Sequence, residues 1–73
     1  MELGVVDHFD EQRGLGTVRS PRHGLLSFHC ASIADGTRTI EVGVPVAFRL
    51  VAGELGRFEA RDVQSLATVS AGP

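Results

Sequence analysis

The side chains whose types and spacing could do chemistry lie in two short segments, R-G-L-G-T-V at residues 13–18 and L-S-F-H-C at residues 26–30. The second segment ends in His29 followed by Cys30, a pair that could act as base and nucleophile. Neighbours on a regular strand point to opposite faces, so the two side chains would meet only where a bulge bends the strand. A small residue that fills space is the simpler interpretation of Cys30. Because the sequence also lacks paired carboxylates and a supported nucleophile, we predict that the protein is not an enzyme.

His8 and His29 are the remaining candidates for a metal site. We expect them on one face of the molecule, where they could stack on bases, stay solvated or bind a metal. Two histidines without a third ligand are weak evidence for a metal, so we predict neither metal nor cofactor. Gly14 and Gly16 do not form a phosphate-binding loop, because the strand–loop–helix setting and the lysine of such loops are missing. Tight packing between strands explains these two glycines.

The length of 73 residues predicts one small domain with a single core. The single cysteine excludes an internal disulfide, and no Cys/His spacing resembles a zinc site, so hydrophobic packing must hold the fold. Acidic residues interrupt every apolar run near the amino terminus, and no stretch approaches the roughly 20 apolar residues of a membrane span. We therefore expect a cytoplasmic protein without a membrane partner.

The charges are unevenly distributed around a net charge of -2, which argues against binding duplex DNA through charge alone. All seven basic residues are arginines. Residues 1–11 carry four acids and no base, residues 12–40 carry four arginines and one acid, and residues 41–73 carry three arginines and four acids. The four arginines of the middle segment, which holds both motifs, either contact phosphates or solubilise turns, and their clustering favours contact.

Short alternating runs separated by Gly and Pro turns predict five strands, at residues 3–10, 15–20, 25–31, 44–51 and 57–66. The first three form a meander, residues 32–43 are a long connection, and the last two form a hairpin. This order fits an OB-fold, a barrel that binds oligonucleotides on the face of its second and third strands, although the periodicity alone fits other small barrels as well. The predicted core residues are Val6, Val18, Leu26, Phe28, Ile33, Val46 and Phe48, with Leu50, Phe58, Ala60 and Val63 also facing inward. Residues 1–66 would form the domain, and 67–73 a flexible tail.

The motifs resemble those of bacterial cold shock domains over residues 4–66. The family pattern G-x-V-K-W-F-N-x-x-K-G-F-G-F-I corresponds to residues 4–18, and V-F-V-H-F-S-A-I to residues 26–33. Residues 35–40 match D-G-(aromatic)-(K/R)-(T/S)-L after a connection that is one residue shorter, and residues 41–48 parallel E-G-x-x-V-x-F. The resemblance implies an all-β, five-stranded OB-fold barrel of cold shock type.

The resemblance also implies binding of single-stranded RNA or DNA, with bases stacked on surface aromatics and phosphates drawn to a positive groove. The binding residues carried over are His8, Phe9, Arg13, Leu15, Thr17, Ser27, His29, Cys30 and Arg38. Most family aromatics are replaced: His8 stands for Trp, while Leu15, Thr17, Ser27 and Cys30 stand for Phe, and Thr37 stands for the aromatic of the connection. Asp7 stands for Lys. Phe9 is either a core residue or a stacking platform.

These replacements leave two functional hypotheses. Stacking is worth roughly 1–3 kcal/mol per base, so the replacement of most surface aromatics predicts weak, sequence-tolerant binding of single strands. We expect a monomer or a weak dimer. The role would be that of an RNA chaperone or a regulator of gene expression. The alternative is a degenerate domain that has lost nucleic acid and serves as a protein-interaction module, which the small polar residues Thr17 and Ser27 would suit.

Overall fold

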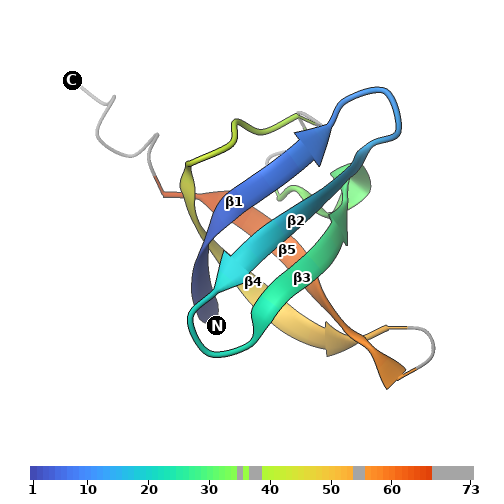
Figure 1. Cartoon of the computed structure of the whole chain (residues 1–73). Helices are drawn as coiled ribbons and strands as arrows, with labels where there is room; N and C mark the ends of the chain where they lie inside the picture. The colour runs from blue at the N-terminus through green and yellow to red at the C-terminus, as the bar shows by residue number, and fades with distance from the viewer. Residues whose placement is uncertain (35, 37–38, 54–55, 67–73) are drawn as a thin grey trace.

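Five strands close into a barrel in the order β1-β2-β3-β5-β4 (Figure 1). The computed structural model describes residues 1–34, 36, 39–53 and 56–66. The elements are β1 (Glu2–Asp10), β2 (Leu15–Ser20), β3 (Gly24–His29), the short 3-10 helix η1 (Cys30–Ser32), β4 (Pro45–Ala52) and β5 (Phe58–Ser65). Within the described ranges, no helix is long and apolar enough to cross a membrane. The predicted five-stranded OB-fold barrel is confirmed, whereas the predicted flexible tail at residues 67–73 lies outside the described residues.

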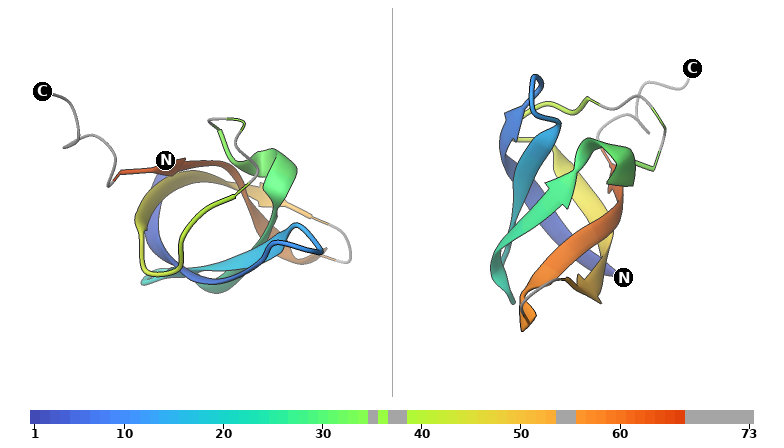
Figure 2. Two further views of the ribbon diagram at one scale, coloured as in Figure 1. Left: turned by 90° about the horizontal axis from the view of Figure 1, so that it is seen from above. Right: turned by 90° about the vertical axis from the view of Figure 1, so that its right-hand side faces the viewer.

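Strand β1 joins the two halves of the barrel, because it pairs with β2 along one edge and with β4 along the other. All of these pairings are antiparallel, as is that of β4 with β5. The barrel closes where β3 and β5 run parallel, through the pair Ser27 and Glu59, and an isolated bridge joins Ile33 to Val63 just beyond. Seen along its axis, the barrel is a ring of strands with η1 at its rim (Figure 2).

The core consists of inward-facing apolar side chains from all five strands and from the segment after η1. Its members are at most 5% exposed: Val6, Val18, Leu26, Phe28, Ile33, Val46, Phe48, Ala60 and Val63. All seven predicted core residues are therefore confirmed, together with Ala60 and Val63, while Leu50 is half-buried against the core. Burying a Val, Leu, Ile or Phe side chain stabilises a fold by about 1.5–3 kcal/mol, so these residues supply the packing that no disulfide provides.

Phe58 was predicted to face inward, and this prediction is wrong, because the side chain is 56% exposed. It opens β5 opposite Ala52, the last residue of β4, where the hairpin extends away from the barrel wall (Figure 1). Alternation places Phe58 on the same side as buried Ala60, but the core ends before the strand does. The alternation of a strand predicts burial only along the part that lies over the core.

Two smaller differences concern the ends and the pattern of strands. Strand β3 ends at His29 instead of residue 31, because the chain turns into η1 at Cys30. Ala47 alternates with the inward-facing Val46 and Phe48, an alternation that predicts an outward side chain, but it is only 4% exposed. The pairing of β4 with β5 shifts register between Ala47 and Arg49, and β1 covers the other edge at Leu3. A methyl group between two paired strands has little surface left to expose.

The central position of Phe48 gives a direct test of the core. Phe48→Ala removes a side chain that is 0% exposed, and such truncations cost about 3–5 kcal/mol. A small domain has about 5 kcal/mol of stability, so we expect a largely unfolded protein in a thermal melt followed by circular dichroism. The matched control is Phe58→Ala, which should cost about 1 kcal/mol or less, because only part of that ring is out of water. Equal melts for the two variants would contradict the assigned core.

Candidate nucleic-acid interface

A bulge in β1 decides which side chains reach the outer face. Val6 is paired with Val18 and His8 with Thr17, so Asp7 is an extra residue without a partner of its own on β2. An extra residue reverses the alternation beyond it. Before the bulge, Val5 faces outward and Val6 faces the core. After it, His8 is exposed and Phe9 turns towards the interior.

The outer face of β1, β2 and β3 carries two rows of side chains. The first row is His8, Thr17 and Ser27, which are direct neighbours across the three strands. The second row is Asp10, Leu15 and His29. The structure thus brings five of the predicted binding residues onto one face: His8, Leu15, Thr17, Ser27 and His29. Four of them are exposed and Thr17 is half-buried, so a single strand could contact this face without rearrangement of the barrel.

Phe9 lies in a third row, on the inner side of the same strands. It is paired with Gly16, which in turn is paired with Phe28. The rings of Phe9 and Phe28 are stacked, with centroids 5.9 Å apart and planes 11° from parallel. A Cβ on Gly16 would lie 2.6 Å from Cζ of Phe28, so only glycine leaves room for this ring pair. Phe9 is therefore a half-buried extension of the core, and strand packing explains Gly16.

Cys30 follows the exposed His29, so alternation directs its side chain inward, and the chain turns into η1 at this residue. Its backbone N–H donates a 2.7 Å hydrogen bond to the carbonyl oxygen of Gly14. Its Sγ would be 2.7 Å from a Cβ placed on Gly14, whose φ of 67° also favours glycine. Cys30 was carried over as a binding residue, but its side chain is not on the outer face: it is half-buried against the β1–β2 turn and the core.

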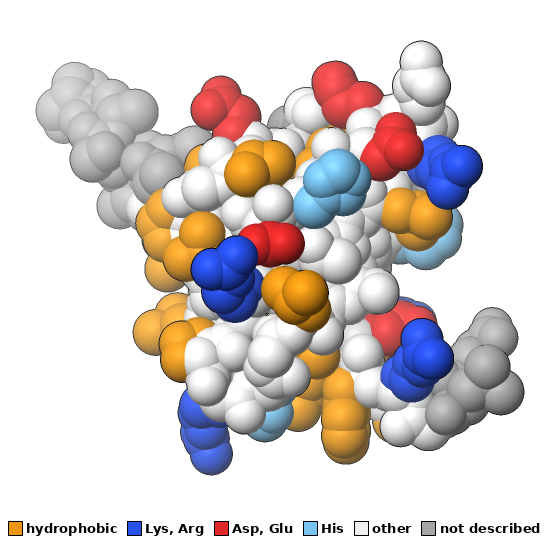
Figure 3. All heavy atoms as spheres, in the orientation of Figure 1, with side chains coloured by type: hydrophobic (Ala, Val, Ile, Leu, Met, Phe, Trp, Pro, Cys, Tyr) orange, Lys and Arg blue, Asp and Glu red, His pale blue; other side chains and the backbone are white. Residues whose placement is uncertain are grey.

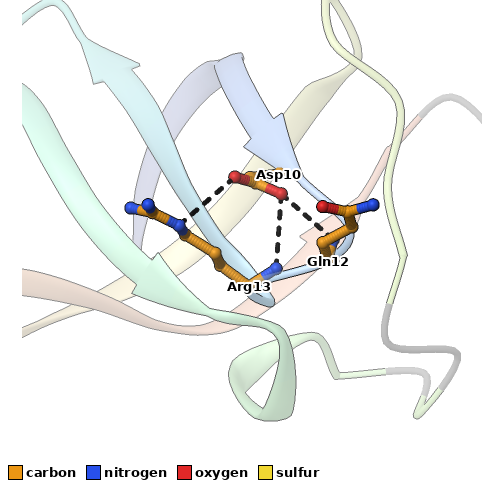
Figure 4. Close-up of polar contacts among 3 residues, drawn as sticks. All are labelled: Asp10, Gln12 and Arg13. Atoms are coloured by element: carbon orange, nitrogen blue, oxygen red, sulfur yellow. Dashed lines mark hydrogen bonds and ion pairs between the residues drawn. The ribbon is translucent and has the colours of Figure 1, made fainter.

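Acidic side chains neutralise two arginines of the motif segment. The bulged Asp7 forms an ion pair with Arg19 on β2. Asp10 accepts hydrogen bonds from the backbone N–H groups of Gln12, at 3.0 Å, and Arg13, at 3.3 Å, and its second oxygen lies 3.9 Å from Nε of Arg13 (Figure 4). Exposed ion pairs are worth about 0–1 kcal/mol, so a phosphate can compete for either arginine. Arg38 lies outside the described residues.

The resulting surface mixes charges of both signs with histidines and separate apolar side chains, and no continuous apolar platform crosses it (Figure 3). Among the described residues, no three His, Cys, Asp or Glu side chains gather into a group that could hold a metal ion.

One exposed aromatic residue was not among the predicted binding residues. Phe58 lines a groove of about 560 Å³ between the beginnings of β3 and β5. The groove is lined by His23, Leu25, Leu26, Ser27, Gly56, Arg57, Phe58 and Glu59. One sequence signal could have predicted that Phe58 is exposed: it lies two residues after Gly56, at the very start of a strand.

Comparison with known proteins agrees with the geometry. No family model and no curated protein sequence matches the chain. Among 36 matching chains of solved structures is one described as Drosophila Unr CSD456, a structure of cold shock domains. It superimposes with a TM-score of 0.72 at 27% sequence identity over 89% of this chain. The chain spans 26% of the length of that protein chain. The barrel is therefore of the cold shock type.

The different surroundings of Ser27 and Cys30 predict different tolerance to a larger side chain. Cys30→Phe forces a ring into the contact with Gly14, and such overpacking costs about 1–3 kcal/mol. Ser27→Phe adds the same ring at an exposed position and should change the free energy of unfolding by about 0.5 kcal/mol or less. Urea unfolding of both variants measures the difference. Equal stability would mean that Cys30 points away from the turn.

Proposed function

We propose that this domain binds single-stranded nucleic acid weakly and with little sequence preference. The observation that carries the proposal is the outer face of β1–β3, where His8, Leu15, Thr17, Ser27 and His29 lie together on a barrel of cold shock type. An open face of an OB barrel lets successive bases lie against side chains while the backbone stays in water.

The composition of this face sets the strength of binding. Two imidazoles and Leu15 offer flat or apolar contact to bases, whereas Thr17 and Ser27 offer hydroxyl groups. Each missing aromatic platform withholds about 1–3 kcal/mol, so affinity should fall in the micromolar range rather than the nanomolar range. We propose a non-enzymatic role in the cytoplasm, as an RNA chaperone or a regulator of gene expression.

A protein-interaction module is the second candidate, and a different surface favours it. Leu3, Val5 and Val42 are 63%, 43% and 61% exposed and line a groove of about 660 Å³ beside the Asp7–Arg19 ion pair. Exposed apolar side chains around a groove are typical of contact surfaces. Leu3 and Val5 lie before the bulge of β1, so a variant at either position leaves the His8–Thr17–Ser27 row intact.

Fluorescence anisotropy of labelled oligonucleotides distinguishes the two candidates. We expect binding of short pyrimidine-rich and mixed single strands at low salt, weakening as salt rises, because displaced counterions make affinity fall with salt concentration. A duplex of the same length should bind less well. The absence of any single-strand binding at high micromolar protein would overturn the proposal in favour of the second candidate.

Restoring aromatic residues on the outer face should strengthen binding. Thr17→Phe and Ser27→Phe are neighbours across β2 and β3, and each should add about 1–3 kcal/mol of binding free energy where a base reaches it. Thr17→Leu with Ser27→Leu is the matched control, because it adds apolar surface without a ring. A folded Phe double variant whose anisotropy titration matches that of the wild type would remove these positions from the site.

The Asp7–Arg19 ion pair predicts that removal of the acidic partner increases the salt dependence of binding. Asp7→Asn releases Arg19 from its partner. One additional cation that contacts a phosphate should steepen the slope of log affinity against log salt by about 0.7. Asp62→Asn, which releases Arg49 on β4, is the control and should leave the slope unchanged. Equal slopes for Asp7→Asn and the wild type would mean that Arg19 does not contact the strand.

A further inference from the structure

The groove between β3 and β5 exists because these two strands share only one ladder pair. Ser27 is paired with Glu59, and before this pair the strands diverge. Gly24 opens β3 while β5 begins in the hairpin that extends away from the barrel (Figure 1). Leu25 and Phe58 are left 61% and 56% exposed along the groove between them.

Phe58 is an aromatic side chain that lies outside the core. The chain has four phenylalanines and neither Trp nor Tyr, and all four lie in described strands. Phe28 and Phe48 are buried, and Phe9 is stacked on Phe28. Phe58 alone among them presents more than half of its surface to water. A ring face in solvent is the feature that stacking on an unpaired base requires.

The charges near the groove differ from those on β1 and β2. Arg13 and Arg19 have carboxylates beside them, and on the β4 side Arg49 is 2.8 Å from Asp62. Arg57 and Arg61 are exposed on either side of Glu59, and neither forms an ion pair with another described residue. A guanidinium group without a carboxylate partner can contact a phosphate without first breaking an ion pair.

The groove is continuous with the outer face of the sheet through Ser27. This residue ends the row formed with His8 and Thr17 and also lines the groove with Phe58. A single strand that crosses the row from β1 towards β3 arrives next at Glu59, the partner of Ser27, and beside Glu59 at Phe58 and Arg57, which line the same groove. The contact surface would then extend beyond β1–β3 onto β5.

We propose that the groove between β3 and β5 is the stacking subsite of this domain, which takes one unpaired base of a single strand against Phe58 and the adjoining phosphate at Arg57. The subsite rests on the proposed single-strand binding. It moves the aromatic contact from the outer faces of β2 and β3, where Thr17 and Ser27 stand, to the hairpin of β5.

The test compares three variants at one position by anisotropy titration with a labelled pyrimidine-rich single strand. Phe58→Leu keeps an apolar side chain but loses the ring, Phe58→Ala loses both, and Phe58→Tyr keeps the ring. We expect Leu and Ala to weaken binding by about 5- to 150-fold, the range that loss of a stacked base implies, while Tyr retains it. Thermal melts check that all three variants stay folded.

A fluorescence measurement locates the base directly. The natural chain contains no Trp, so Phe58→Trp introduces a single fluorophore into the groove. We expect its emission to be quenched as the single strand is added. Leu3→Trp, at an exposed site on β1 outside both the groove and the His8 row, is the control and should not be quenched.

The outcomes separate failure of the subsite from failure of the proposed function. If the wild type binds single strands but Phe58→Leu binds equally well and the Trp at position 58 is not quenched, the subsite is wrong and the proposed function stands. If the wild type binds no single strand, both are overturned, and the exposed Phe58 belongs to a protein contact instead. Weakened binding in Phe58→Leu together with quenching at position 58 supports the subsite.

Discussion

The register shift in β1 is the constraint on which the rest of the molecule depends. This strand must pair with β4 through residues 2–5 and with β2 along most of its length, and the extra residue Asp7 accommodates both. Without it, a shift by one residue would turn His8 inwards and Phe9 outwards. The bulge thus completes the core with the Phe9–Phe28 stack and places His8 beside Thr17 on the outer face.

The bulge also shapes the electrostatics of the face. It leaves the carboxylate of Asp7 next to Arg19, so the cation nearest the centre of β1–β2 is already neutralised. Asp10 similarly orders the turn that carries Arg13. Arg57 and Arg61, which form no ion pair with another described residue, lie on β5 or just before it, near the exposed Phe58. Two unpaired arginines and the exposed aromatic ring therefore lie close together at the start of β5.

Much of the fold could be predicted because the core alternates with period two. The turns at Gly14 and Pro21, and the buried positions Val18 and Phe48, follow from this pattern. The bulge at Asp7 has no such signal, and for that reason the sequence did not decide whether Phe9 is a core residue or a stacking platform. The exposure of Phe58 depends on where β5 lies relative to the end of the core, which is a tertiary feature that alternation along one strand does not contain.

Chemical-shift mapping by NMR tests the central claim most directly, because it reports every backbone amide in one experiment. The ¹⁵N-labelled domain is titrated with a short unlabelled pyrimidine-rich single strand. The account predicts that the largest changes form one track through His8, Thr17 and Ser27 to Phe58. Changes confined to the groove at Leu3, Val5 and Val42, or no changes at saturating strand, would contradict it.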